Sequence, residues 1–484
     1  MTPKRKHVRF YPSAAAAQQA GFRACKRCRP DAAPGSPEWD GRADVVARAM
    51  RLIGDGVVDR EGVPGLAARV GYSVRQLQRM LLAEVGAGPI AIARAQRAQT
   101  ARVLIETTAL TMTEVAFAAG FSSVRQFNDT IRAVFATAPS ELRKRARPRG
   151  TGAGVGSVGE RGRVGAVAPD SGKDTRADAG ASGSILLRLP FRRPLCPDNL
   201  FGHLAATAVP GVEEVVGNTY RRTLRLAHGP GIVELTPTAD HVACRMTLSD
   251  LRDLTTAIAR CRWLLDLDAD PQAIDELLGA DPAFAATVAM APGRRVPRCV
   301  DGPEMAVRAV LGQQVSTAAA RTHAARIVAQ CGEALGDPRG GLTHLFPEPR
   351  TLGEVQLAMP ASRTRTLHAL VGVLCKGRLS LDPGCDRGEA LSILSDLPGF
   401  GPWTTQVIAM RALGDPDAFP AADLGVRRAA EALGLPAAPV ALTAHAECWR
   451  PWRAYAVQYL WSFTPHPINR WPSSTDTTQL KEAA

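Results

Sequence analysis

A glycine-rich turn and one aspartate have the residue types and spacing for chemistry at a phosphate-bearing substrate. Residues 397–404 read Leu-Pro-Gly-Phe-Gly-Pro-Trp-Thr, and Asp423 follows twenty residues after Trp403. Two glycines after a proline allow a tight turn between helices, and N–H groups beside a helix N-terminus bind phosphate without reading sequence. A Pro/Ala-rich turn places Asp423 at the start of the helical pattern 424–428. The pattern indicates a phosphate anchor with one carboxylate nearby.

This combination resembles the helix-hairpin-helix DNA glycosylases. In that family the Leu-Pro-Gly-x-Gly turn is the hairpin, here with Pro398, Gly399, Phe400 and Gly401 as DNA-binding residues, and the downstream aspartate is catalytic. The resemblance therefore implies a catalytic role for Asp423. The alternative is an ordinary pair of helices with a capping aspartate.

The length and composition of the chain limit the classes of protein to which it can belong. A chain of 484 residues is too long for one core, and 45% apolar with 22% charged residues is typical of soluble globular proteins. We find no apolar run of about 18 residues, so we expect no membrane partner and a cytoplasmic location. Residues 1–184 hold 29 Lys/Arg against 16 Asp/Glu, whereas residues 185–484 hold 30 of each. The basic surplus favours nucleic-acid contact in the first part.

Residues 40–146 contain an internal repeat. An apolar helical pattern that ends in Gly-Tyr-Ser at Ser73 recurs 49 residues later as Gly-Phe-Ser at Ser122, and each copy then opens a second helix at a serine N-cap. Such tandem helix-turn-helices resemble AraC-type DNA-binding domains. The alternative is a plain helical bundle. The expected DNA contacts are Arg75, Gln78, Arg79, Arg125, Gln126 and Asn128.

Cys25 and Cys28 form a C-x-x-C, the spacing of two zinc thiolates. The segment resembles the second half of the Ada-type zinc domain. In that family a preceding C-x3-C supplies the other two ligands, one of which is the methyl-accepting cysteine, and this pair has no counterpart here. Zinc is expected at this incomplete site only if other ligands exist, and we interpret the missing half as truncation or a misassigned start. A weaker alternative keeps methyl acceptance at Cys25 or Cys28, which predicts a stable thioether there.

The rest of the chain predicts a mostly α, multidomain fold. Strands are expected at 185–189, 220–226 and 231–235, a helix at 201–207, and helices from 251 onward with loops near 333–345 and 378–388. The expected segments are a partial Ada-type metal-binding segment (1–35), the AraC-type tandem helix-turn-helix domain (40–146), a disordered linker (147–183), a small α+β subdomain (184–250), an all-α helix-hairpin-helix domain (251–472) and a tail (473–484).

The order of motifs over residues 185–472 is similar to 3-methyladenine DNA glycosylase II. The resemblance implies hydrolysis of the N-glycosidic bond of alkylated purines, such as 3-methyladenine and 7-methylguanine, in base excision repair of double-stranded DNA. It places four residues in the base pocket: Trp403, Trp461, His203 and Val407. His203 and Val407 stand where aromatic residues occur in relatives, so base selectivity is expected to differ. The range of excised bases stays open.

The same resemblance implies further roles. Gln314, with Gln313 beside it, corresponds to the residue inserted into the duplex gap. The carbonyls of Ser395, Leu397 and Phe400 correspond to positions that hold a monovalent cation, and no cofactor is required for excision. A lysine of the bifunctional lyases is replaced by Trp403, which predicts hydrolysis without strand cleavage.

We therefore expect a repair hydrolase of the alkylation response attached to a sequence-specific DNA-binding module. The alternative is a transcriptional regulator of that response whose glycosylase half only binds damaged DNA. Promoter DNA is a candidate second partner, and the operator and oligomeric state stay open.

Overall fold

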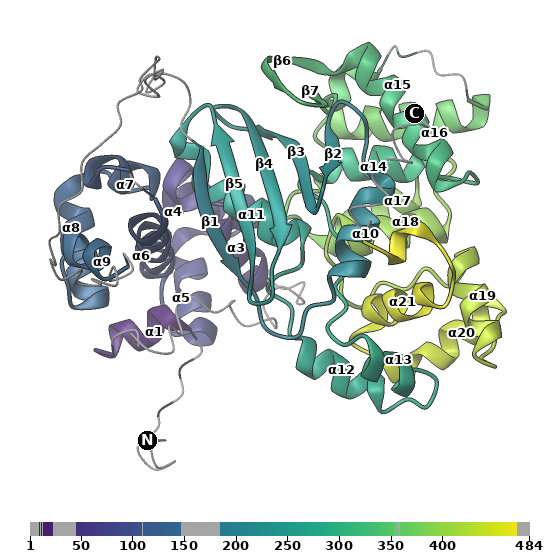
Figure 1. Cartoon of the computed structure of the whole chain (residues 1–484), viewed down its shortest axis with the longest axis horizontal. Coiled ribbons are helices and arrows are strands. Elements are labelled where there is room, and N and C mark those ends of the chain that lie inside the picture. Colours follow the sequence, from purple (N-terminus) through teal and green to yellow (C-terminus); the bar gives the residue numbers. More distant parts are fainter. Residues whose placement is uncertain are drawn as a thin grey trace, which may run out of the picture.

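The computed structural model describes residues 9, 11, 13–22, 45–108, 110–146, 184–353, 355 and 359–471. A helical part comes first, a five-stranded sheet second and a larger helical part third, with the sheet between the two helical parts (Figure 1). Cys25, Cys28, the expected linker 147–183 and the expected tail 473–484 lie outside the described residues.

The first part contains both helix-turn-helix copies. Its helices are α1 (Ala14–Gln19), α3 (Val45–Gly54), α4 (Val57–Val70), α5 (Val74–Val85), α6 (Pro89–Thr107), α7 (Met112–Ala118), α8 (Val124–Phe135) and α9 (Pro139–Ala146). Ser73 caps α5 by accepting the Gln76 N–H, as predicted. The prediction of Ser122 as the cap of α8 is wrong by one residue. Ser123 accepts the Gln126 N–H instead, because a longer turn separates α7 from α8.

The second part is an antiparallel sheet in the order β1-β5-β4-β3-β2. The strands are β1 (Ile185–Pro190), β2 (Glu213–Val216), β3 (Thr219–Leu226), β4 (Gly229–Pro237) and β5 (His241–Leu248), with α10 (Pro197–Thr207) between β1 and β2. Alternate β1 residues are buried, as expected for a strand with one face on the core. The three predicted strands and the predicted helix are confirmed, while β2 and β5 were not predicted.

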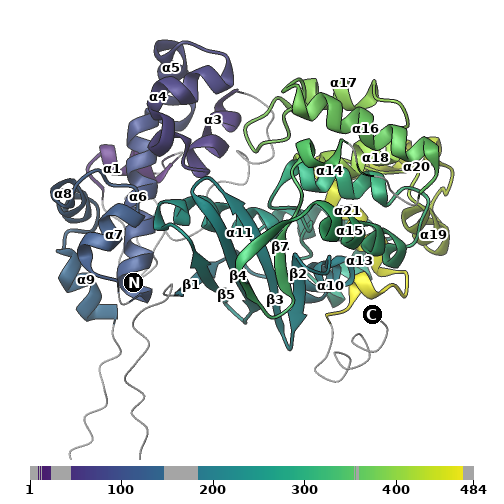
Figure 2. The same cartoon turned by 90° about the horizontal axis from the view of Figure 1, so that it is seen from above.

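A shared apolar core joins the sheet to the first helical part. It includes Leu104 and Ile105 of α6 together with Leu187 and Leu189 of β1, all at most 3% exposed. We expected residues 147–183 to separate these parts. The shared core instead packs α6 directly against β1, and the two parts also lie side by side in Figure 2.

Among its described residues, the third part consists of helices, loops and one hairpin. Its helices are α11 (Leu254–Leu264), α12 (Pro271–Gly279), α13 (Ala285–Met290), α14 (Gly302–Leu311), α15 (Thr317–Cys331), α16 (Ala361–Cys375), α17 (Arg387–Ser395), α18 (Pro402–Arg411), α19 (Leu424–Ala432), α20 (Pro439–His445) and α21 (Arg453–Ser462).

The expectation of a loop near 333–345 is wrong. This segment forms the strands β6 (Glu333–Arg339) and β7 (Leu342–Leu345), which pair as a hairpin. It contains three glycines, together with Asp337 and Pro338, so it lacks a local strand signal. Packing decides its structure: Leu342 and Leu345 are buried against Ile232 of β4, and the Thr223 hydroxyl donates to the His344 carbonyl at 2.9 Å.

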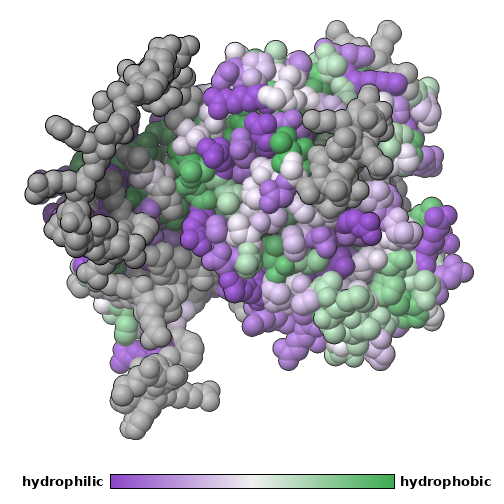
Figure 3. Space-filling model, viewed as in Figure 1, coloured by the Kyte–Doolittle hydropathy of each residue, from purple (hydrophilic) through white to green (hydrophobic). Residues whose placement is uncertain are grey.

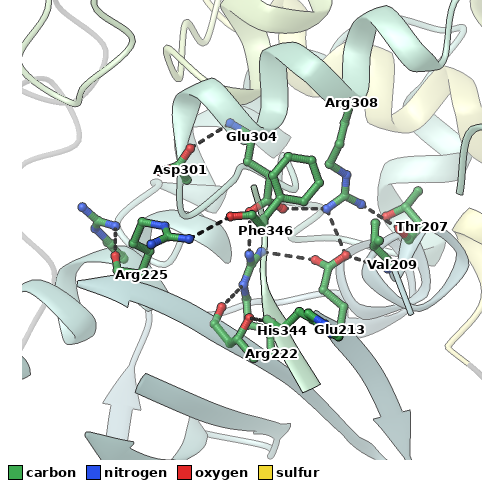
Figure 4. Close-up of polar contacts among 12 residues, drawn as sticks. Thr207, Val209, Glu213, Arg222, Arg225, Asp301, Glu304, Arg308, His344 and Phe346 are labelled. Carbon is green, nitrogen blue, oxygen red and sulfur yellow. Dashed lines mark hydrogen bonds and ion pairs between the residues drawn. The ribbon is translucent and has the colours of Figure 1, made fainter. Parts of the chain in front are cut away.

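A buried charge network connects the sheet to α14 (Figure 4). Arg222 of β3 pairs with Glu213 at 3.2 Å and with Glu304 at 2.8 Å, and Arg308 pairs with the same two glutamates at 2.9 and 3.0 Å. Tyr220 donates its hydroxyl to Glu213. Burial by itself raises the pKa of Glu213, but Arg308 and Arg222 outweigh this and lower it. The network fixes α14, which leads directly into the turn that contains Gln313 and Gln314.

In the part of the chain that the structure describes, no helix is both long and apolar enough to cross a membrane. Hydrophilic residues cover much of the visible described surface in Figure 3, with smaller apolar areas among them.

Candidate active site and nucleic-acid interface

Asp423 lies at the N-terminus of α19, where its carboxylate accepts three N–H groups. Oδ1 accepts the Val426 backbone N–H and the Trp461 indole N–H, each at 3.0 Å. Oδ2 accepts the Trp403 indole N–H at 2.8 Å. Trp403 lies in the first turn of α18 and Trp461 in the last turn of α21, so three separate helices converge here. A half-buried carboxylate fixed between two aromatic rings suits stabilisation of a nearby positive charge.

The other two predicted pocket residues come from α10 and α18. His203 is buried, and its ring stacks on Trp461 with centroids 6.4 Å apart and planes inclined by 23°. Its Nε2 is buried and has no hydrogen-bond partner. Val407 is 7% exposed and packs in the apolar core around α14 and α16. His203 therefore adjoins the Trp461–Asp423 pair, whereas Val407 contributes to the supporting core.

The imidazole of His203 is held neutral. Burial, followed by the positive charges of Arg411 and Arg308, lowers the pKa of His203 well below its usual value. Because the unfolded histidine takes up a proton near its ordinary pKa of 6.5, the folded state loses stability as the pH falls below that value.

We expect His203→Phe to remove this pH dependence. Between about pH 7.5 and about pH 5.5, the parent should lose more stability than the variant, by up to about 1.4 kcal/mol per pH unit below the unfolded pKa. Urea unfolding of both proteins at the two pH values measures the difference. The remaining histidines are the same in both proteins, so their contributions cancel in the comparison. Equal losses in parent and variant would mean that His203 is not held neutral by the fold.

The predicted hairpin connects α17 to α18. Gly399 has φ of +81°, and an added Cβ would lie 2.0 Å from the Thr366 hydroxyl oxygen, so only glycine fits this position. Gly401 precedes Pro402, the first residue of α18, and Pro398, Gly399 and Gly401 are all exposed. Phe400 is buried and anchors the turn in the core. The exposed turn at a helix N-terminus is a suitable phosphate site.

The turn after α14 places the two predicted glutamines differently. Gln314 is exposed and has φ of +54°, a left-handed conformation that a residue with a side chain rarely adopts. Gln313 instead donates its amide N–H to the Gly399 carbonyl at 3.0 Å and to the Thr404 hydroxyl at 2.9 Å. Gln313 thus ties the turn to the hairpin, and Gln314 is the residue that points away from the core.

Sequence reasoning missed two residues that support this surface. Arg363 of α16 donates to the Gln313 carbonyl at 2.5 Å, and Thr366 of the same helix packs under Gly399. Neither lies in a recognisable motif. The two contacts join residues 33 to 50 positions apart, so only the packing of α16 beneath the hairpin reveals them.

The predicted helix-turn-helix contacts lie on the second helix of each copy. Arg75, Gln78 and Arg79 are exposed on α5, and Arg125 and Gln126 are exposed on α8, while Asn128 is half-buried. The Gln126 side-chain oxygen accepts the Ser122 hydroxyl at 3.0 Å. Both helices therefore present polar side chains at the surface.

Cys25 and Cys28, the predicted zinc ligands, lie outside the described residues. Within the described ranges, Asp281, His445 and Cys448 bring potential metal-ligating atoms within 4.8 Å of one another. Asp281 already accepts the Trp449 indole N–H at 2.7 Å and the Ala283 backbone N–H at 2.9 Å, so its carboxylate serves the local packing.

Three family models match the chain. They are the AlkA N-terminal domain over residues 186–301, a helix-turn-helix domain over residues 66–145 and the metal binding domain of Ada over residues 1–31. The "probable bifunctional transcriptional activator/DNA repair enzyme AlkA" of Mycobacterium tuberculosis is 59% identical, over 97% of this chain and 90% of that protein. DNA-3-methyladenine glycosylase 2 of Escherichia coli is 32% identical, over 54% of this chain and 92% of that protein.

Among solved structures, the 3-methyladenine DNA-glycosylase from Archaeoglobus fulgidus aligns with a TM-score of 0.48 and 19% identity, over 57% of this chain and 97% of that chain.

The family models and the relatives from Mycobacterium tuberculosis and Escherichia coli define the class of this protein: a DNA repair glycosylase fused behind a helix-turn-helix DNA-binding domain. The chain belongs to the AlkA family, in the form that carries the Ada-type and helix-turn-helix segments in front of the glycosylase.

Proposed function

We propose that this protein hydrolyses the N-glycosidic bond of alkylated purines in double-stranded DNA and leaves an abasic site with an intact strand. The observation that carries the proposal is the Asp423 carboxylate held by the indole N–H groups of Trp403 and Trp461. The two indole rings flank Asp423, which stands at the position of the catalytic aspartate in the family that the sequence resembles.

Breaking this bond builds positive charge on the deoxyribose. The Asp423 carboxylate stabilises that charge and orients or deprotonates the attacking water. The three N–H donors keep its oxygens in place, so little reorganisation is needed at the moment of reaction. The alkylated base already carries a positive charge, which improves it as a leaving group. Trp403 provides no amine for a Schiff base, which is why the strand stays intact.

Aromatic faces select the substrate. A flipped cationic purine gains stacking and cation–π contact from Trp403 and Trp461. The neutral imidazole of His203 stacks on Trp461 without repelling the cation, because burial and the arginines keep it unprotonated. Val407 sets the volume behind the rings from its buried position on α18.

Three elements bind the duplex. The exposed N–H groups around Gly399 and Gly401 contact phosphate, and Gln314 enters the gap left by the flipped base. A monovalent cation bound by the carbonyls of Ser395, Leu397 and Phe400 supports the phosphate contact. These are hard oxygen donors at an exposed turn, although the Leu397 carbonyl also accepts the Phe400 N–H.

Release of free base from a duplex with one 7-methylguanine or 3-methyladenine tests the proposal. We expect stoichiometric base release, and strand breakage only after alkali. Breakage before alkali treatment would contradict the monofunctional chemistry, and absence of any base release would contradict the glycosylase function.

The exposed polar faces of α5 and α8 favour a second function as a regulator that binds promoter DNA. The two functions are separable. A variant without Asp423 should lose excision and retain sequence-specific binding of an operator chosen by selection from random duplexes, while Arg79→Ala should weaken that binding and leave excision intact. Loss of both properties in either variant would contradict two separate functions.

A further inference from the structure

Helix α3, which packs against the first helix-turn-helix copy, contacts the loop before α17, the first of the two helices that the glycosylase hairpin joins. In α3, Arg48 donates from Nε to the Gly384 carbonyl at 3.0 Å and pairs with Asp386 at 3.3 Å. Arg51 donates to the Pro383 carbonyl at 2.5 Å. These contacts cross more than 330 residues of sequence, and Figure 2 shows the loop before α17 reaching toward α3.

The contact is tightly packed. Leu52 of α3 is 3% exposed, and a Cβ added to Gly384 would lie 2.2 to 2.6 Å from three of its side-chain carbons. Real Cβ atoms do not approach this closely, so the glycine is needed for the close approach of the loop to α3. Arg51, which donates to the Pro383 carbonyl, is only 7% exposed. Burial, hydrogen bonds and close packing together indicate a specific interface between α3 and the loop before α17.

The loop of residues 382–386 sets the position of α17 and α18, the two helices that the hairpin joins. Asp386 caps α17 by accepting the Glu389 N–H through Oδ1, while its Oδ2 faces Arg48. Arg387, the first residue of α17, donates to the carbonyls of Leu413 and Gly414 just beyond the end of α18. Displacement of this loop therefore moves the start of α17 and the end of α18 together.

Helix α3 also belongs to the unit formed by α3, α4 and α5, which contains the first helix-turn-helix copy. Leu52 of α3 shares one apolar core with Leu66 of α4 and with Leu77 and Leu81 of α5, the helix that carries Arg75 and Arg79. Close-packed cores transmit displacements rather than absorb them. A second contact holds this unit on α11, where the Thr256 hydroxyl donates to the Asp55 carbonyl at 3.0 Å.

We propose that α3 is a positioning element of the glycosylase: it holds the 382–386 loop, and through it the hairpin, in the orientation that binds damaged DNA. The inference rests on the proposed glycosylase function and extends it, because it makes the helix-turn-helix part a component of the repair site. Binding at α5 and binding at the hairpin are then coupled, and such coupling is reciprocal.

Gly384→Ala in the full-length protein tests the proposal. Its methyl group forces the loop away from Leu52, and we expect the dissociation constant for a duplex with an abasic-site analogue to rise roughly 5-fold or more, the lower end of measured coupling. The rate of single-turnover base release at saturating enzyme should change less than about 2-fold, because the substitution does not alter Asp423 or the groups that donate to it. Gly372→Ala on α16 is the matched control, since its Cβ meets open space.

Two further variants distinguish positioning from general damage. Leu52→Ala combined with Gly384→Ala makes room for the added methyl group and should restore most of the binding. Arg48→Met removes the bonds to Gly384 and Asp386 without adding bulk, and should weaken binding in the same direction even if Gly384→Ala does not fold.

Unchanged duplex binding in a folded Gly384→Ala or Arg48→Met protein would overturn the role of α3, as would a loss that the Gly372→Ala control shares. The abasic duplex reports binding without base release, so the positioning role is judged separately from catalysis. A parent protein that binds this duplex tightly yet releases no base would contradict the proposed reaction alone.

Discussion

Replacement of Asp423 by asparagine is expected to lower the rate of base release by several orders of magnitude, on the order of 10³-fold or more. An amide carries no negative charge to stabilise the developing cation on the sugar. It also has an NH2 donor in place of one carboxylate oxygen, so one of the two indole N–H groups, Trp403 or Trp461, would face a donor and lose its acceptor. The variant should still fold, because asparagine caps a helix N-terminus about as well as aspartate.

Single-turnover release of 7-methylguanine measures this effect. The matched control is Asp270→Asn, which makes the same change in the aspartate that caps α12, where it accepts the backbone N–H groups of Gln272 and Ala273, and should keep the parent rate. Trp461→Phe keeps an aromatic ring but removes the donor to Oδ1, so an intermediate rate is expected. Base release by Asp423→Asn at a rate close to that of the parent would remove Asp423 from the catalytic role.

The second large effect is expected from Arg222→Met in the buried network between the sheet and α14. The side chains of Arg222, Glu213 and Glu304 are at most 5% exposed, so the substitution leaves each glutamate with one fewer buried positive partner. Removing one member of a buried ion pair costs about 3–5 kcal/mol, because the desolvated partner charge remains.

Urea unfolding of the full chain measures this loss as a lower midpoint of the transition that the glycosylase part undergoes. Arg350→Met is the control. Arg350 also pairs with a glutamate, Glu348, but its side chain is 76% exposed, so a change below about 1 kcal/mol is expected. If both variants were equally stable, the network would contribute no more than a surface pair.

Local sequence patterns were sufficient for most elements that carry the site. The largely apolar segment 185–189 predicted β1, and the glycine-aromatic-serine repeat predicted both helix-turn-helix copies. The β6–β7 hairpin could not be predicted in this way, because its strand conformation depends on burial against Ile232 rather than on its own residues. The cap of α8 was misplaced by one residue because turn length is not encoded by the repeat.

The sequence by itself indicated the class of this protein and the residues that we propose for its chemistry: the Gly-Phe-Gly hairpin, Asp423 at the family spacing, and Trp403 in place of a lysine. These are short-range signals, since each depends on residue type and spacing along the chain. Only the tertiary structure showed that Trp403 and Trp461 donate to the same carboxylate. It also showed that Gln313 binds the hairpin while Gln314 stays exposed, and that α3 contacts the loop before α17. Those facts depend on packing between distant segments, which residue spacing does not contain.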